Sequence, residues 1–252
     1  MTKKKKAVIA IIIILFLLFL IFVALCYLLK TKKLLINKYF IKKTDTIGVD
    51  LSVYQGDVNM QRLKEQNIKF VYIKATEGSS HVDRYFQTNW ENAANTGLVR
   101  GAYHFFSFDS SGKTQAQNFI ATVGDLEGSL LPVVDVEYYA DKKIHPPKRE
   151  AVVKELRSYI KTIEAEYGVK PMIYAPRSIE KKFLKGDFKD CTRWRRSVYY
   201  HVFIDAGNDW EVWQYTDLGE LEGFNGDQKY IDLNVLNRKI KLEDITVFAN
   251  NN

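Results

Sequence analysis

Cysteine, proline and glycine are all scarce in this chain of 252 residues, which has 2 Cys, 5 Pro and 14 Gly. The low glycine and proline content excludes collagen-like and low-complexity classes, and a hydrophobic share of 46% is ample for a full-sized core. Beyond residue 45 the only cysteine is Cys191, so the globular part has no internal disulfide. We therefore expect its core to supply its stability.

Several signatures of catalysis and ligand binding are missing as well. There is no GxSxG nucleophile motif and no Walker or GxGxxG phosphate loop. The histidines show no metal-ligand spacing; they are His81, His104, His145 and His201. The sequence therefore predicts no metal site, no cofactor and no nucleophile–base triad.

Positive charge is concentrated at the N-terminus. Ten lysines against Asp45 alone give residues 1–45 a net charge of +9, and since the whole chain carries +7, residues 46–252 carry −2. The sequence pI of 9.1 thus reflects the N-terminal arm. A nucleic-acid partner would require a basic face on the globular part, and we expect none.

Residues 7–29 are apolar without interruption. At about 1.5 Å per residue, this run exceeds the roughly 30 Å of a hydrocarbon core. A cleaved signal peptide would have a shorter run of about 7–15 residues, and a lipoprotein would have a smaller residue than Leu25 before Cys26. We predict a single transmembrane anchor at 7–29, after a basic cytoplasmic N-terminus (1–6) and before a basic tether (30–45). Lysines flank both ends, so charge alone does not set the orientation.

Short β-rich runs alternate with helical patterns after residue 45. Helical spacing of apolar residues occurs near 86–94, 116–123 and 152–167, and helices become scarce after residue 197. We predict one α/β domain at 46–240, a TIM-like barrel that has lost late helices, followed by a tail at 241–252. The alternative is a doubly wound open sheet. The expected strands are 47–51, 70–75, 101–106, 131–136, 171–174, 198–203, 211–215 and 230–233.

Four carboxyl groups lie at strand ends in this reading. Asp50 ends the first run, Asp135 and Glu137 end the fourth, and Asp232 lies in the last. Because side chains alternate along a strand, Asp135 and Glu137 point to the same side. Two close carboxyls raise each other's proton affinity, which keeps one available as a general acid. The alternative for any one of them is a turn or helix cap.

Aromatic residues accompany these carboxyls and suit a sugar ligand. About half of them should line a groove, and the rest should belong to the core. They are Tyr54, Tyr72, Tyr103, Phe105, Tyr138, Tyr174, Trp213 and Tyr215. Gln214 and His104 are polar residues at strand ends, expected to bind substrate or to support residues that do.

The ordered motifs IGVDLSVYQGDV, FVYIKATEG, RGAYHFF, LPVVDVE, PMIYAPRS, WEVWQYTDLGELEG and YIDLNVLN resemble those of the glycoside hydrolase family 25 lysozymes. The resemblance covers about 47–237. It implies a barrel of eight strands and about five helices, and hydrolysis of the β-1,4 bond between N-acetylmuramic acid and N-acetylglucosamine in peptidoglycan. The chain departs from many members at RWRRSVYYHVF around Trp194, where we expect the groove to differ.

The resemblance also implies residue roles. Glu137 would be the general acid, Asp135 would hold the substrate N-acetyl group during its attack on the anomeric carbon, and Asp50 and Asp232 would complete the acidic floor. The expected substrate-binding residues are Tyr54, Lys74, Glu77, Tyr103, Tyr174, Trp213 and Gln214.

Together these features predict a monomeric, membrane-anchored muramidase with its barrel outside the cytoplasmic membrane. The partners would be glycan strands and, through residues 7–29, the bilayer. The alternatives are a non-catalytic wall-binding module and a hydrolase of another N-acetylated glycan such as chitin.

Overall fold

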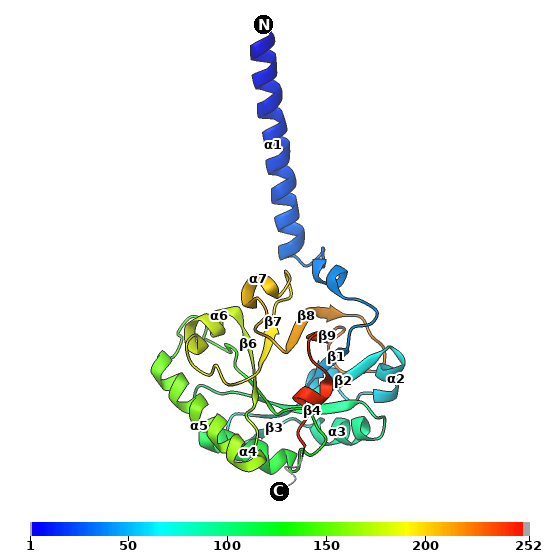
Figure 1. Cartoon of the computed structure of the whole chain (residues 1–252), viewed down its shortest axis with the longest axis vertical. Coiled ribbons are helices and arrows are strands. Elements are labelled where there is room, and N and C mark those ends of the chain that lie inside the picture. The colour runs from blue at the N-terminus through cyan, green and yellow to red at the C-terminus, as the bar shows by residue number, and fades with distance from the viewer. Residues whose placement is uncertain (1, 249–252) are drawn as a thin grey trace.

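A long N-terminal helix stands apart from a barrel in the computed structural model, which describes residues 2–248 (Figure 1). Helix α1, Lys3–Lys30, has 28 residues, none of them buried. At about 1.5 Å per residue it is about 42 Å long, more than a bilayer core requires. Among the described residues it is the one helix long and apolar enough to cross a membrane, although a signal sequence passes the same test. Met1 of the predicted N-terminus and residues 249–252 of the predicted tail lie outside the described range.

Eight of the nine strands in the described residues close into a barrel. The strands are β1 (Ile47–Leu51), β2 (Ile68–Glu77), β3 (His81–Val82), β4 (Val99–Phe105), β5 (Val133–Asp135), β6 (Met172–Pro176), β7 (Arg193–Arg196), β8 (Val212–Gly219) and β9 (Ile231–Leu236). The order β1-β9-β8-β7-β6-β5-β4-β2 returns to β1 through a β1–β2 pairing, and β3 only extends the edge of β2. This closure confirms the predicted TIM-like barrel and excludes the open doubly wound sheet.

The helices surround the first two thirds of the barrel and shrink thereafter. They are α2 (Met60–Glu65), α3 (Phe86–Ala94), α4 (Gly112–Val123), α5 (Arg149–Tyr167), α6 (Arg177–Ile179) and α7 (Phe203–Ala206), with 3-10 or π turns at Ile36–Phe40, Val53–Gln55, Glu180–Leu184 and Leu242–Ile245. Only three or four residues remain in α6 and α7. The late loss of helices that the pattern predicts is therefore present.

Strand β9 runs opposite to its neighbours. It pairs antiparallel with both β1 and β8, whereas the other barrel pairs are parallel. The start of β9 consequently lies beside the ends of the parallel strands, and Asp232 pairs in register with Asp50. A residue near the beginning of a strand thereby reaches the rim at which the other carboxyls end.

The predicted strand at 198–203 is wrong. The sixth barrel strand is β7, which begins five residues earlier, and residues 203–206 form α7 instead. The sequence RWRR does not read as apolar, yet Arg193, Trp194 and Arg195 are buried. Buried acceptors explain this: Arg193 donates to the backbone oxygens of Phe188 and Cys191, so its charge lies within a polar frame.

Apolar side chains fill both the barrel interior and the layer between barrel and helices. The outer layer joins the apolar faces of α3, α4 and α5 to the strands, and Gly112 of α4 lies so close to α5 that an added Cβ would be 1.7 Å from the Glu155 oxygen. The interior cluster is built around Phe70, Tyr72 and Trp194. This packing holds the strand ends, and with them the site, in a fixed frame.

Residues 31–45 do not form a free tether. Asn37 is buried, and its amide donates to the backbone oxygens of Ser197 and Tyr215, at 2.7 and 2.9 Å. Lys32 pairs with Asp217, and Asp45 pairs with Arg238 at 2.7 Å. The predicted domain boundary between residues 45 and 46 therefore falls inside packed structure.

The predicted tail at 241–252 also begins inside packed structure. Ile245 and Val247 are buried, and Thr246 forms an isolated bridge with Leu130. The barrel thus extends at least to residue 247, beyond the predicted end at 240.

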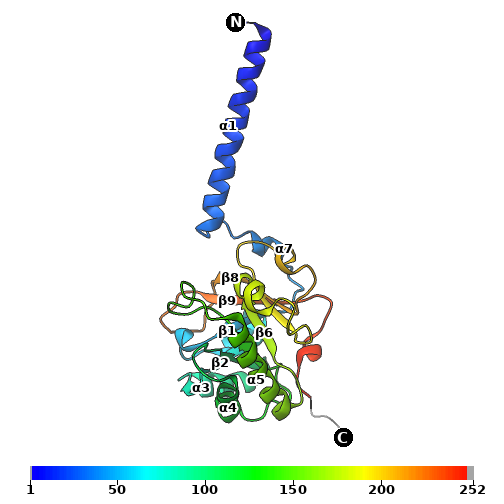
Figure 2. The same cartoon turned by 90° about the vertical axis from the view of Figure 1, so that its left-hand side faces the viewer.

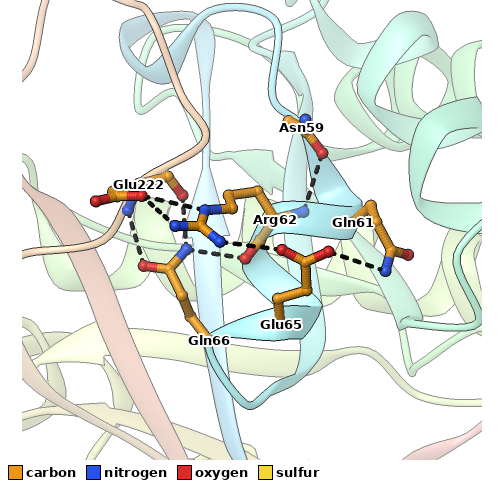
Figure 3. A network of polar contacts seen from close by, with 6 residues as sticks. All are labelled: Asn59, Gln61, Arg62, Glu65, Gln66 and Glu222. Carbon is orange, nitrogen blue, oxygen red and sulfur yellow. Dashed lines mark hydrogen bonds and ion pairs between the residues drawn. The ribbon is translucent and has the colours of Figure 1, made fainter.

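The connection between β8 and β9 is fastened to α2. Arg62 bonds Glu65 and Glu222, and Gln66 bonds the backbone of Glu222 in both directions (Figure 3). Further along, Gly226 lies so close to the first barrel loop that an added Cβ would be 2.1 Å from the Tyr54 oxygen. These contacts fix the β8–β9 connection in position beside the end of β1.

Candidate active site

A cavity of about 210 Å³ opens at the rim where the parallel strands end. All four predicted carboxyls line it, and the lining residues come from seven strands and from the segments after β1, β5 and β8. The lining residues are Asp50, Leu51, Ser52, Tyr54, Gln55, Lys74, Tyr103, Phe105, Val133, Asp135, Glu137, Tyr174, Trp194, Gln228 and Asp232. The acidic cluster and several aromatic side chains thus line one cavity, as their positions at strand ends predict.

Asp50 and Asp232 share a proton at the floor of the cavity. Burial first, and then the charge of the nearby Asp50 carboxylate, raise the pKa of Asp232 to about 9. Burial also raises the pKa of Asp50, but hydrogen bonds from Asn234 and Asp232 oppose this and hold it at about 6. At neutral pH, Asp232 is therefore protonated and donates to an ionised Asp50.

A tryptophan fixes this arrangement. The indole N–H of Trp194 can only donate, and it donates to Oδ1 of Asn234 at 2.8 Å. The amide nitrogen of Asn234 must then face Asp50, to which it donates at 2.7 Å. Because Asn234 presents a donor, Asp50 is held as an acceptor.

Replacing Asp232 by Asn should weaken the pH dependence of stability. With a folded pKa of about 9 against about 3.9 when unfolded, the folded chain keeps a proton that the unfolded chain has lost. The free energy of unfolding therefore falls as pH rises between these values. The Asp232→Asn variant, whose neutral amide still donates to Asp50, should melt a few °C higher than wild type at pH 8, with a smaller difference at pH 4.

Tryptophan fluorescence suits this measurement because all four tryptophans lie after residue 45. Asp227→Asn, in an exposed loop, is the control. A variant that melts below wild type at pH 8 would contradict the proton assignment.

Asp135 and Glu137 form the second carboxyl pair. Asp135 is the last residue of β5, and Glu137 follows two positions later on the same side. Burial first, and then the charge of Glu137, raises the pKa of Asp135 well above its usual value; burial also raises the pKa of Glu137. One oxygen of Asp135, Oδ1, is buried without a hydrogen-bond partner. The cavity therefore presents an unused acceptor beside a proton donor.

Arg196 is a cation close enough to these acids to shift their pKa values. Its guanidinium bonds Asp217 at 2.9 Å, and Asp217 also binds Lys32 from the segment after α1. The charge of Arg196 lowers the pKa of Glu137, against the larger effect of burial. It acts in the same direction on the other three carboxyls. The sequence reasoning missed Arg196, because a basic residue in RWRR reads as solvent-exposed.

Tyr174 connects the acid to the barrel interior. Its hydroxyl donates to Oε1 of Gln214 at 2.8 Å and lies within hydrogen-bond reach of Glu137. A hydroxyl has a single proton. While the Tyr174 hydroxyl donates to Gln214, its oxygen can accept a hydrogen bond from protonated Glu137. Once Glu137 has lost its proton, rotation of the hydroxyl would let it donate to the Glu137 carboxylate.

The predicted substrate-binding residues divide into two groups. Tyr54, Lys74, Tyr103 and Tyr174 line the cavity, and Tyr54 is 54% exposed. Glu77 does not line it; it binds Lys74 at 2.6 Å, and Lys74 in turn lowers the pKa of Asp135.

Trp213 and Gln214 are placed elsewhere. Trp213 is buried on the opposite side of β8, in a cluster with Val202 and Val235, and its indole donates to the Ser197 oxygen. Gln214 is buried behind Tyr174. Since side chains alternate along a strand, two adjacent residues of β8 cannot both face the cavity. The position of Trp213 gives no support to its predicted role.

His104 belongs to the protein interior. It is fully buried between Thr76 and Gln115, with ring nitrogens 2.7 and 3.0 Å from their oxygens, and it stacks on Tyr159. Burial lowers its pKa to about 4, so it is neutral.

The sequence could have indicated Asn234 as a site residue, because it lies two residues after Asp232 and alternation along β9 places both on the same side. The predicted strand at 198–203 left Arg196 and Trp194 outside any strand, so no pattern indicated them.

The sequence of residues 49–224 matches the family model described as glycosyl hydrolases family 25. The chain belongs to this family. A solved family 25 glycosyl hydrolase from Bacillus anthracis is 47% identical, with a TM-score of 0.73, and the match covers 79% of this chain and 93% of that one.

Curated relatives agree with this family 25 assignment. Protein YegX of Escherichia coli (strain K12) is 33% identical over 211 residues, which is 80% of this chain and 72% of the relative. Lysozyme M1 of Streptomyces globisporus is 30% identical over 211 residues, which is 75% of this chain and 67% of the relative. The similarity to these proteins extends over 211 residues and is not limited to single motifs.

Replacing Arg196 by Gln should move the alkaline limb of the kcat/KM profile of this family 25 enzyme to higher pH. Without the guanidinium, only the Tyr174 hydrogen bond opposes the effect of burial, and the pKa of Glu137 rises further. A general acid would then stay protonated over a wider range. Initial rates on soluble glycan fragments between pH 4 and 9, with Arg157→Gln on α5 as the control, provide the measurement. An alkaline limb that stays in place or moves to lower pH would rule out this role for Arg196.

Proposed function

We propose that this chain is a membrane-anchored muramidase that hydrolyses the β-1,4 bond between N-acetylmuramic acid and N-acetylglucosamine in peptidoglycan. The observation that carries the proposal is the convergence of four carboxyls on one cavity rim in a family 25 barrel. The similar chain from Streptomyces globisporus, named a lysozyme, supports the choice of substrate.

In the proposed reaction, Glu137 gives its proton to the glycosidic oxygen as the C–O bond breaks. The acetamido oxygen of the substrate attacks the anomeric carbon and forms an oxazolinium ion, while Asp135 accepts the acetamido N–H. Water then opens this ring, with Glu137 taking the water proton, and the configuration is retained. The unpartnered Oδ1 of Asp135 is the acceptor that such an N–H requires.

Substrate binding also determines which acid of the Asp135–Glu137 pair is protonated. In the empty cavity burial raises the pKa of both acids, and that of Asp135 lies well above its usual value. A hydrogen bond donated to a carboxylate favours its charged form, so an acetamido N–H at Asp135 lowers the pKa of that group. The proton then resides on Glu137, where cleavage needs it.

The proposed location follows from the substrate and from α1. Peptidoglycan lies outside the cytoplasmic membrane, so the barrel would be extracytoplasmic and α1 would be the single span. Lys3 to Lys6, at the start of α1, would then be the cytoplasmic positive charges.

A comparison of glycans tests the proposed substrate. The full chain in detergent should cleave soluble peptidoglycan fragments and leave chitin oligomers of equal length intact, as judged by mass spectrometry. If chitin oligomers are cleaved at an equal or higher rate, the proposed substrate is wrong and another N-acetylated glycan takes its place in the proposal.

A further inference from the structure

Exposed apolar side chains gather near the end of α1 that adjoins the barrel. Among the described residues outside α1, nine large hydrophobic side chains are exposed, and five of them belong to the segment after α1, the loop after β7 or α7. We call these five the anchor-side patch: Tyr39, Phe40, Tyr199, Phe203 and Ile204. Of the other four, Tyr54 lines the cavity, and Val82, Ile144 and Phe248 come from three separate segments.

Direct contacts join the two parts of the patch, the segment after α1 and the loop after β7. The ammonium of Lys32 lies 5.5 Å from the ring centre of Tyr199, and the Phe40 ring lies 4.8 Å from that of His201. Both cartoon views show α7 beside the barrel end of α1, with α3 and α4 on the far side of the barrel (Figures 1 and 2). The β7–β9 side of the barrel therefore faces the anchor.

The connection is too short to let this side move far from α1. Six residues lie between Lys30, the last residue of α1, and the buried Asn37, so these two residues are at most about 25 Å apart when the connection is fully extended. Docking of this segment through Asn37 and Asp45 prevents it from lengthening further.

The chemistry of the patch suits a lipid–water interface. Phe203 and Ile204 are 61% and 65% exposed, and Tyr39 is 75% exposed with a polar hydroxyl tip. Tyrosines and other amphipathic rings prefer the headgroup level. The exposed Lys30, Lys33 and Lys38 add positive charge, and lysines near an anionic surface attract it by about 1 kcal/mol each.

Carboxylates near the patch are already paired. Asp205 of α7 binds Arg177 at 2.8 Å, and Asp209 binds Arg195 at 2.7 Å. The patch therefore offers apolar surface and cations to an anionic bilayer without an unpaired acid in α7 to oppose it.

We propose that the anchor-side patch docks on the outer surface of the same bilayer that α1 spans, with Phe203 and Ile204 inserted at the headgroup level. The barrel then sits on the membrane in one orientation, and its cavity is held at a fixed height above the lipid. This inference rests on the proposed membrane anchoring and adds a second contact with the bilayer.

Spin labels on the full chain in vesicles of phosphatidylethanolamine and phosphatidylglycerol test this docking. One protein has Ile204→Cys and a matched one has Ile144→Cys, which is 77% exposed on a different segment. Both also have Cys26→Ser, and the protein with Cys26→Ser alone checks that the buried Cys191 takes no label. Collisions with oxygen, which partitions into lipid, are compared with collisions with a water-soluble nickel complex.

The label at 204 should show an oxygen-to-nickel ratio several-fold above that of the label at 144. Equal ratios at the two sites would overturn the docking. A label on the native Cys26 separates this failure from failure of the anchor, because residue 26 lies within α1. If the Cys26 label favours the nickel complex, α1 is outside the lipid and both proposals are overturned.

Discussion

Glu137→Gln should reduce the rate of glycan cleavage by about 10³-fold and leave the melting temperature within about 2 °C of wild type, because a general acid contributes 10²–10⁴ to the rate. Glutamine keeps the shape of the side chain and can still bond the Tyr174 hydroxyl, but it has no acidic proton to donate. Burial raises the pKa of Glu137, so the wild-type chain holds that proton where an unburied carboxyl would lose it.

Initial rates on a soluble peptidoglycan fragment, with unfolding followed by tryptophan fluorescence, measure both parts of this result. Glu150→Gln, at an exposed position in the first turn of α5, is the matched control and should keep the wild-type rate. A folded Glu137→Gln protein with a rate within threefold of wild type would remove Glu137 from the reaction.

Asp135→Asn should lower kcat by about 10²-fold or more, since an oriented group that acts in the transition state contributes on this scale. The carboxylate has an unpartnered buried oxygen, Oδ1, and asparagine would present either a neutral oxygen or an N–H donor at this place. Neither can stabilise positive charge that develops on the acetamido group. We therefore expect kcat to fall more than KM rises.

The anomeric configuration of the first product provides a second readout for Asp135. Proton NMR of a fresh digest by the wild-type chain should show the β-anomer before it equilibrates, because attack by the acetamido oxygen followed by water inverts the centre twice. An α-anomer as first product would contradict attack by the acetamido oxygen, and a large rise in KM with unchanged kcat would reduce Asp135 to a binding residue.

The acidic cluster was predictable because it depends on local rules. Alternation places Asp135 and Glu137 on one side, and the end of a parallel strand places them at the rim. Asp232 was found although it lies near the start of a strand; the antiparallel direction of β9, which brings it to Asp50, has no signal in the sequence.

The residues that tune the cluster could not be predicted in the same way. Arg196 and Trp194 lie in a strand whose charged residues suggest an exposed segment, and both donate to acceptors that are distant in the chain. Lys32 and Asn37 lie in a basic segment that reads as a solvated tether. Their contacts with Asp217 and the Ser197 oxygen form only when the barrel exists.

The most direct test of the central claim is the identity of the reducing ends that the full chain creates in purified peptidoglycan. After digestion in detergent, the fragments are reduced with borohydride and analysed by mass spectrometry, with Glu137→Gln as the control. Cleavage as proposed should produce muramitol ends that are absent from the control digest. Glucosaminitol ends, or no fragments from a folded wild-type chain on several wall types, would contradict the account.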